Sequence, residues 1–483
     1  MHPDEILRAS AGKWPNRTAV IDHQGLVTYD ELAKGAEILS KNLIRHGIGK
    51  GHGLGVRTRN GRDFIVAMFA GLQAGAAILP IYNAMPAKEL TGLLTIARLH
   101  GILDDNSAPP FPAEDCTNLV TDVGRELLFY RTGRPFSEPL VEWLPEAALL
   151  RFTSGTTGTS KGVVISHQAA ADRIAAAQSA FQFTPEDVVL CVLPMAFHFI
   201  VSVLVYLHAG VTIVVHDGYI PDVLLASANR HGATFLYATP MYYRLLSGAP
   251  SSPGFKTLQR AVSTSSFLSA EIAHSFYERY DIPVIQAYGL IELGIPLMNV
   301  HQARNHPEAA GEPMPGYRYR LVSEDGSSVD DGVTGRLQVA GPGMFQGYLN
   351  PEKRAAEVLQ DGIWFSTGDY ATAAHNLVTI SGRSGSVIHV SGQKVFPEEV
   401  EAVLNRHPEI AESRVLAKTH RLFGEIVHAD VVLRDKSARV DVEEIIRFCR
   451  RDLASYKTPQ SVAYVDEIST TPSGKIRRNA GEI

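Results

Sequence analysis

A run of glycines and small hydroxyl residues between two apolar segments is the stretch of this sequence best suited to chemistry. It lies within LLRFTSGTTGTSKGVVISH, residues 149–167. Glycines let consecutive backbone N–H groups turn toward an anion, hydroxyls add donors, and Lys161 supplies a positive charge. We expect a polyphosphate-binding loop made of Thr153, Ser154, Gly155, Thr156, Thr157, Gly158 and Lys161. A flexible hairpin is the alternative. The segment is not a Walker A motif, because it has neither the GxxxxGK[ST] spacing nor the helix that follows it.

Four charged motifs follow this loop in order: YGLIELG at 288–294, FSTGDY at 365–370, SGR at 381–383 and SGKIRR at 473–478. Taken singly, each has an ordinary interpretation. A Tyr-Gly pair is common in turns, TGD makes a plausible β-turn, and SGKIRR is an acceptable exposed basic tail. Their order and spacing after a phosphate loop favour a shared role in one site.

The elements that must position these residues are mostly alternating helices and strands. Thr28 and Glu31 form a capping box for an amphipathic helix that Gly47 closes. From residue 56 to 215, helical stretches alternate with short apolar runs, which indicates α/β layers around a mostly parallel sheet. The apolar runs 64–82 and 199–215 are interrupted by glycine and polar residues, so we read each as a buried helix turning into a strand.

Beyond residue 312 the sequence pattern changes, and it predicts short strands separated by Gly, Pro, Asp and Ser turns. We predict an α/β protein with a large N-terminal domain of layered sheets, residues 1–385, whose residues from about 312 form a β-rich subdomain. A small α+β domain, residues 386–483, contains a helix at 397–405, strands around Val415 and Val431, and a helix at 442–453.

Composition restricts the class of protein. The 483 residues are 45% hydrophobic and 20% charged, which is typical of a globular protein that buries a large core. The net charge of −6 comes without a basic stripe, so nucleic acid is not an expected partner. Three distant cysteines support neither a disulfide framework nor a zinc site. With no secretory signal and no expected membrane span, we predict a cytoplasmic enzyme.

With this loop and these motifs, the chain resembles the adenylate-forming superfamily of acyl-CoA and aryl-CoA ligases, luciferases and peptide-synthetase adenylation domains. The resemblance runs in order from TYDEL at residue 28 to SGKIRR and covers nearly the whole chain. It implies that Mg-ATP activates a carboxylic acid as an acyl-adenylate, with release of pyrophosphate, before the acyl group passes to a nucleophile.

The resemblance also implies residue roles. Tyr288, next to Gly289, would stack on adenine, with Ser266 beside it. Asp369 and Arg383 would bind the ribose, while Glu292 and Thr156 would hold Mg²⁺. Lys475 would be the catalytic lysine, on a small domain that rotates between half-reactions. Gly392 and Lys394, in VSGQKV, would then serve transfer to coenzyme A; an ordinary edge strand is the alternative reading of this segment.

Several positions depart from the family pattern. Ile291 stands where Thr is usual, Ser160 replaces a common proline, and Gly385 occupies the hinge, where Asp or Lys is usual. STSSFLS at 263–269 replaces a glycine-rich segment beside the expected adenine site. We expect Ile291 to slow adenylation through the loss of a hydroxyl donor, at a cost of about 1.5 to 3 kcal/mol.

The acyl pocket is expected between LPMAFHF at 193–199 and the strand before Tyr288. Phe197 and Ala287 would line it, and the methyl group of Ala287 favours a compact ring or a short acid over a long chain. His198 either approaches the acyl carboxylate or is an ordinary histidine of the core.

We therefore predict an AMP-forming acid-thiol ligase that uses ATP, Mg²⁺ and coenzyme A on a small carboxylic acid. An amide synthetase or a carrier-protein ligase shares the first half-reaction, and a degenerate nucleotide-binding protein is the reading from another class. The retention of Glu292, Asp369, Arg383 and Lys475 together argues against degeneration. The identities of the acid and the acceptor, and the oligomeric state, stay open.

Overall fold

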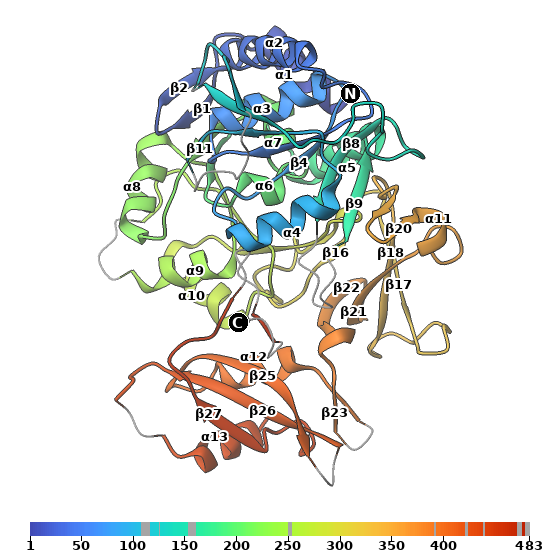
Figure 1. The fold of residues 1–483 in the computed structure, drawn as a ribbon. Helices are drawn as coiled ribbons and strands as arrows, with labels where there is room; N and C mark the ends of the chain where they lie inside the picture. The colour runs from blue at the N-terminus through green and yellow to red at the C-terminus, as the bar shows by residue number, and fades with distance from the viewer. Residues whose placement is uncertain are drawn as a thin grey trace.

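The computed structural model describes residues 1–107, 116–124, 126–152, 161–249, 254–390, 393–420, 424–437, 440–470 and 476–478. Within these ranges the chain forms two large β-sheets flanked by helices, a smaller four-stranded sheet beside them, and a separate C-terminal sheet with its own helices. Figure 1 shows the C-terminal domain in orange and red below the large lobe. The predicted α/β fold class is confirmed.

The first sheet has nine strands, and its central strands run parallel. In spatial order they are β16 (Glu312–Pro313), β15 (Gly294–Met298), β14 (Val284–Leu290), β13 (Arg260–Ser263), β12 (Phe235–Ala238), β10 (Val188–Cys191), β11 (Thr212–Val215), β1 (Thr18–Asp22) and β2 (Gly25–Thr28). Its parallel strands read as continuous apolar runs because helices cover both faces. Antiparallel strands close both edges.

The second sheet also has nine strands. They are β20 (Glu352–Arg354), β19 (Gly347–Leu349), β9 (Gly162–Ser166), β8 (Ala147–Phe152), β4 (Ala77–Pro80), β3 (Gly53–Arg57), β5 (Gly101–Asp104), β7 (Leu127–Arg131) and β6 (Cys116–Leu119). Strands β8 and β9 pair antiparallel and flank the expected phosphate loop, as the sequence predicts. Residues 153–160 of that loop lie outside the described residues.

Helices pack on these sheets, and the helix predicted between Thr28 and Gly47 is confirmed as α2. They are α1 (Pro3–Lys13), α2 (Tyr29–Arg45), α3 (Arg62–Gln73), α4 (Ala87–Ala97), α5 (His167–Phe181), α6 (Met195–His198), α7 (Val203–Ala209), α8 (Pro221–His231), α9 (Pro240–Gly248), α10 (Ala270–Tyr280) and α11 (Ala355–Val358). Thr28 caps α2: its hydroxyl accepts from the Glu31 N–H at 3.3 Å. The two apolar runs are α3 leading into β4 and α7 leading into β11, each through a glycine with positive φ.

The β-rich region is an antiparallel sheet of β17 (Arg318–Val322), β18 (Gly335–Ala340), β21 (Phe365–Ala374) and β22 (Leu377–Arg383). A short 3₁₀ helix, Ser384–Ser386, follows it. The C-terminal domain then contains β23 (Ile388–Val390), β24 (Gln393–Val395), α12 (Pro397–Leu404), β25 (Ile410–His420), β26 (Gly424–Leu433), α13 (Val442–Cys449) and β27 (Ser461–Tyr464). Helix α13 is shorter than predicted, because the chain turns after Cys449 and buries Leu453 separately.

Three apolar clusters lie in the described parts of the chain. The largest joins the two nine-stranded sheets, their helices and the β-rich sheet, a smaller one packs on the second sheet, and the third lies between Ile388 and Leu453 in the C-terminal domain. All three cysteines are free, as expected. Among the described residues, no helix combines the length and apolar character needed to cross a bilayer.

Candidate active site

Three side chains predicted to bind a nucleotide lie together where β14 meets the β-rich sheet. The hydroxyl of Tyr288 donates to the carboxylate of Asp369. Nε of Arg383 lies 3.1 Å from Oδ1 of the same carboxylate, which is 3% exposed. We call Tyr288, Asp369 and Arg383 the Tyr288 cluster. The structure thus brings together residues that are far apart in the sequence.

The pairing of two adjacent strands explains the geometry of this cluster. Antiparallel register between β21 and β22 sets Asp369 opposite Arg383, and the Asp369 N–H donates to Oγ1 of Thr367 at 3.0 Å. Burial and the Asp369 charge raise the pKa of Tyr288, and Asp369 also raises the pKa of Arg383. Both donors therefore keep their protons. Because an ionised carboxylate accepts up to about four hydrogen bonds, Asp369 has capacity for the hydroxyls of a bound sugar.

A second group is built around Glu292. The hydroxyl of Tyr348 in β19 donates to Oε1 of Glu292 at 2.9 Å. Nζ of Lys161, at the start of β9, lies 5.0 Å from the centroid of the Tyr348 ring. Burial and the Glu292 carboxylate raise the pKa of Tyr348, so its hydroxyl remains a donor. We call Glu292, Tyr348 and Lys161 the Glu292 cluster.

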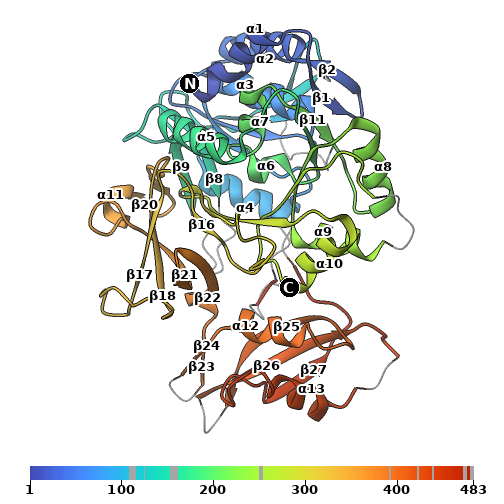
Figure 2. The same ribbon diagram turned by 180° about the vertical axis from the view of Figure 1, so that it is seen from behind.

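Arg173, on α5, holds the backbone that carries Glu292. It is 3% exposed, and it donates to the carbonyl oxygens of Ile291 at 2.8 Å, Glu292 at 2.8 Å and Gly343 at 2.7 Å. Burial lowers its pKa to about 10, which still leaves it charged at neutral pH. A planar guanidinium suits this task because its donors point in fixed directions. Figure 2 shows α5 lying beside β8 and β9.

The donor chemistry of the Glu292 cluster fits a magnesium ion bound to phosphate. One carboxylate oxygen is oriented by Tyr348, and carboxylate oxygens are the hard ligands that Mg²⁺ prefers. The nearby ammonium of Lys161 suits the phosphates that such an ion would accompany. The second predicted ligand, Thr156, lies outside the described residues.

The predicted acyl-pocket residues lie at α6. Nε2 of His198 is 3.4 Å from Oγ of Ser265, and its ring meets Tyr237 edge-on with centroids 5.6 Å apart. A small cavity of about 10 Å³ adjoins it. The cavity is lined by Val189, Cys191, Leu193, Met195, His198, Ser202, Tyr206 and Tyr237. Phe197 packs against Tyr82, and the guanidinium of Arg151 lies 5.6 Å from its ring centroid.

The remaining nucleotide-side predictions lie on or beside β14. Gly289 sits at a β-bulge between β14 and β15, where a Cβ would meet the Gly294 carbonyl oxygen at 3.4 Å. Ala287 is 4% exposed within the large core. Ile291 is half-buried against the same core. Ser266 is half-buried too, but its neighbour Ser265 is the serine that contacts His198.

Lys394 lies apart from both clusters. Its ammonium contacts the carboxylate of Glu324 and lies 2.9 Å from the Tyr370 hydroxyl. In this arrangement Lys394 thus contacts the residue that follows Asp369 in β21, and not a member of the Tyr288 cluster.

The segment on either side of Lys475 is anchored to the C-terminal domain. Thr470 and Ile476 form an antiparallel bridge. The guanidinium of Arg478 lies 2.6 Å from Glu401 and 3.3 Å from Glu398 on α12, and the Arg477 carbonyl oxygen accepts from Arg414 at 3.0 Å. The arginines of SGKIRR are thus not a free basic tail.

Two family models match this chain. The one described as AMP-binding enzyme covers residues 7–349, and the one described as AMP-binding enzyme C-terminal domain covers residues 399–475. The chain belongs to the AMP-binding enzyme family. The adenylate-forming resemblance inferred from the motifs is confirmed.

Similar proteins cover this AMP-binding enzyme almost end to end. It is 26% identical to the indoleacetate–CoA ligase of Aromatoleum aromaticum, over 99% of this chain and 97% of the relative. It is 28% identical to a feruloyl-CoA synthase of an Amycolatopsis species, over 98% of both chains. The crystal structure of ATP-bound MatB from Rhodopseudomonas palustris matches with a TM-score of 0.82 at 25% identity, over 99% of this chain and 97% of that one.

The described part of the chain leaves out some predicted residues of this AMP-binding enzyme, and the sequence reasoning missed others. Outside the described residues lie Thr153, Ser154, Gly155, Thr156, Thr157, Gly158, Gly392 and Lys475. Tyr348 and Arg173 were not predicted. Tyr348 follows a glycine in GPGMFQGYLN, and this segment is as rich in turn residues as the TGD motif. That pattern is a signal that could have indicated Tyr348. Arg173 has no such signal, because its partners are backbone carbonyls distant in the sequence.

Proposed function

We propose that this AMP-binding enzyme is an acid-thiol ligase that converts a small carboxylic acid into its coenzyme A thioester. ATP first activates the acid as an acyl-adenylate and pyrophosphate leaves. The thiol of coenzyme A then attacks the acyl carbonyl carbon and AMP leaves. Family membership supports the adenylation step, and the end-to-end similarity to CoA ligases supports the acceptor.

The observation that carries the proposal is the Tyr288 cluster. It places a buried carboxylate, an aromatic ring and a guanidinium at one point of the large lobe. That combination suits a nucleoside, because a ring can stack on the base while the carboxylate accepts hydrogen bonds from the ribose. We assign Tyr288 to adenine, and Asp369 and Arg383 to the ribose.

The Glu292 cluster is assigned to the phosphates. Lys161 and the loop from Thr153 to Gly158 bind the polyphosphate through charge and backbone N–H groups. Glu292, with Thr156, would hold Mg²⁺, which would neutralise phosphate charge when bound. Arg173 keeps the Glu292 backbone in place, so that the carboxylate does not follow thermal movement of the turn after β14.

The acid must bring its carboxylate to the α-phosphate, and both groups are anionic. The ammonium of Lys475 bridges them and lowers the energy of the transition state more than that of the bound reactants. The carboxylate oxygen then bonds to the α-phosphorus while the bond to pyrophosphate breaks. A rotation of residues 386–483 about the region of Gly385 would exchange Lys475 for the Gly392–Lys394 segment before thiol transfer.

The acid is assigned to the α6 side of the site, where Phe197, His198 and Ala287 line it. A compact acid is favoured, because the buried methyl group of Ala287 narrows this side of the site. The names of the indoleacetate and feruloyl relatives favour an aromatic acid. A carrier-protein thiol or an amine is the alternative acceptor.

The test is pyrophosphate release across a panel of aromatic and short aliphatic acids, with ATP and Mg²⁺, run without acceptor, with coenzyme A and with amines. Turnover that depends on both an acid and coenzyme A supports the proposal. Turnover that requires an amine replaces it with amide synthesis. Absence of activity with every acid, despite ATP binding, would identify a nucleotide-binding protein instead.

A further inference from the structure

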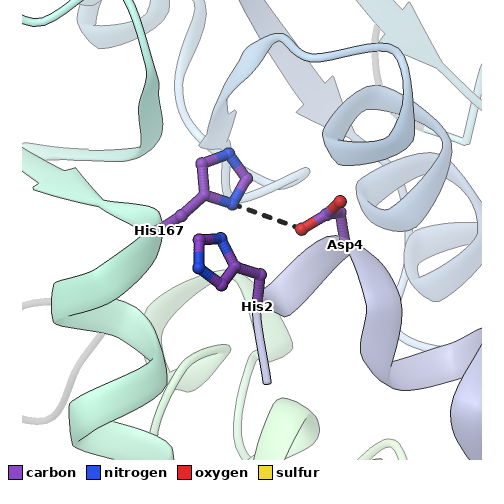
Figure 3. A group of neighbouring side chains, drawn as sticks. All are labelled: His2, Asp4 and His167. Atoms are coloured by element: carbon purple, nitrogen blue, oxygen red, sulfur yellow. Dashed lines mark ion pairs between the residues drawn. The ribbon is translucent and has the colours of Figure 1, made fainter.

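We infer that His2, Asp4 and His167 form a binding site for a divalent transition metal, with Zn²⁺ the expected ion, that ties the N-terminal helix to α5. Figure 3 shows the two imidazole rings lying over one another with the Asp4 carboxylate beside them. One ligand atom from each residue lies within 4.8 Å of the others. This site shares no residue with the Tyr288 and Glu292 clusters, and the inference does not depend on the proposed function.

The donor set selects the class of metal. Two imidazoles and one carboxylate are typical ligands of Zn²⁺, and they suit Cu²⁺, Ni²⁺ and Co²⁺ as well, whereas Ca²⁺ and Mg²⁺ prefer an all-oxygen site. With bonds of about 2.0 to 2.2 Å in tetrahedral geometry, ligand atoms around zinc are separated by about 3.3 Å. Nδ1 of His167 and Oδ1 of Asp4 are 3.4 Å apart already. Only the ring of His2 would have to move toward these two atoms to complete the set of ligands.

His167 presents its nitrogen to this position. Nδ1 is buried, and it lies 3.4 Å from Oδ1 of Asp4, which is longer than most hydrogen bonds. The rings of His2 and His167 are stacked, with centroids 5.7 Å apart and planes inclined by 21°. The His167 side chain is 17% exposed and that of Asp4 35%, so an ion from solution can reach the site.

The backbone holds these side chains although His2 is near the end of the chain. His2 is the N-cap residue of α1, its N–H donates to Oε2 of Glu5 at 3.3 Å, and Pro3 restricts the next turn. His167 is the first residue of α5, after Ser166, whose hydroxyl accepts from the Ala169 N–H at 3.1 Å. The three ligands thus come from the first turns of two helices.

The local charges are compatible with a cation. The N-terminal ends of α1 and α5 are partly positive and oppose it, but Asp4 and Glu5 lie in the same first turn of α1. A bound ion would link α1 to α5 directly, alongside the bond from the Ser10 hydroxyl of α1 to the Leu207 carbonyl oxygen of α7.

The experiment measures Zn²⁺ binding by titration calorimetry on the full chain, with Met1 and His2 native and no polyhistidine tag. We expect one ion per chain. His2→Gln, Asp4→Asn and His167→Gln should each weaken binding at least about tenfold, since even outer-shell partners contribute that much. The control His23→Gln alters an exposed histidine of the same lobe and should leave the affinity unchanged.

Two further measurements keep a folding defect separate from a lost ligand. Thermal unfolding in EDTA should give the same Tm for the wild type and for His2→Gln, and added Zn²⁺ should raise the Tm of the wild type only. Co²⁺ should give a visible absorption band that His167→Gln weakens. Equal Zn²⁺ affinity in the wild type and all three variants, or no binding at about a hundredfold molar excess of Zn²⁺, overturns the inference.

Discussion

The large lobe and the C-terminal domain hold their candidate site residues in different ways. In the large lobe, Asp369 and Arg173 are each 3% exposed, and hydrogen bonds connect them to packed strands. In the C-terminal domain, Lys394 contacts Glu324 at a surface where the Glu324 side chain is 62% exposed. The candidate residues of the large lobe are thus buried and hydrogen-bonded, whereas Lys394 is held at an exposed surface, next to Phe396, whose ring packs against Tyr370 with centroids 5.3 Å apart.

This difference matches the two tasks proposed for the enzyme. Exposed ion pairs contribute about 0 to 1 kcal/mol, so the Lys394–Glu324 contact would oppose the proposed rotation only weakly. Buried charged groups that lose their partners cost several times more, so the nucleotide side of the site stays rigid. Binding is thereby assigned to the rigid part, and exchange of catalytic groups to the movable part.

The largest expected effect tests whether the movable part carries the chemistry. Lys475→Ala should lower acid-dependent pyrophosphate release by about a hundredfold to a thousandfold, because one charge that stabilises the transition state is lost. ATP should still bind, as measured by calorimetry. The control Lys436→Ala removes an exposed lysine of the same domain. Near-normal adenylation by Lys475→Ala would assign the chemistry to the large lobe.

Arg173 tests the rigidity of the large lobe. Arg173→Met should reduce the free energy of unfolding by about 3 kcal/mol or more, because three buried carbonyl oxygens lose a charged donor. Arg173→Lys should recover only part of the lost free energy of unfolding, since one ammonium cannot reach all three carbonyl oxygens. Urea unfolding measures both, with Arg230→Lys on the surface as the control. If kcat falls while the stability is unchanged, the role of Arg173 lies in positioning Glu292 alone.

Glu401 tests how the Lys475 segment is anchored. Burial raises its pKa to about 7 despite the contact with Arg478, so the folded state binds its proton more tightly than the unfolded state. The resulting stability is complete below about pH 4.5 and is lost as the pH rises through 7, by less than roughly 3 kcal/mol.

The matched comparison is Glu401→Gln against Glu409→Gln, a change at an exposed glutamate of the same domain. The Tm of the wild type and of Glu409→Gln should fall more between about pH 5 and pH 8 than that of Glu401→Gln. If Tm changed with pH in the same way for all three proteins, Glu401 would be ionised over the whole pH range, and Arg478 would balance its charge.

Asp369 tests whether the large lobe alone binds the nucleotide. Asp369→Asn should weaken ATP binding by about 2 kcal/mol, roughly thirtyfold, because a neutral amide accepts hydrogen bonds less strongly and donates where Tyr288 and Arg383 also donate. Calorimetry on the variant and on Asp331→Asn, an exposed aspartate of the same subdomain, measures it. An unchanged affinity would move the ribose site elsewhere.

The smallest effect concerns the junction between the two regions. A Cβ at Gly385 would meet no heavy atom within 4 Å, and its φ is not in the left-handed region. Gly385→Asp should therefore change the free energy of unfolding by less than about 0.5 kcal/mol. A change in thioester formation without a change in adenylation, followed by product analysis, would mark residue 385 as the hinge. Equal rates of both steps would place the hinge at another residue.

Much of the fold was predictable from local patterns. The cap at Thr28 and the apolar runs that form α3 with β4 and α7 with β11 follow from spacing and turn residues over fewer than about 20 positions. The length of α13 was overestimated, because a buried leucine beyond a helix end looks the same in sequence as one inside it.

The sequence alone determined which candidate groups are present. They are an expected phosphate loop, Tyr288, Glu292, Asp369, Arg383 and Lys475, in the order of the family motifs. The tertiary structure decided which of these meet. It joined Tyr288 to Asp369, added Tyr348 and Arg173, and set Lys394 against Glu324 and Tyr370. Such contacts link residues far apart in the chain, and no local periodicity encodes them. They exist only when strands from different sheets pack and the buried polar groups find partners.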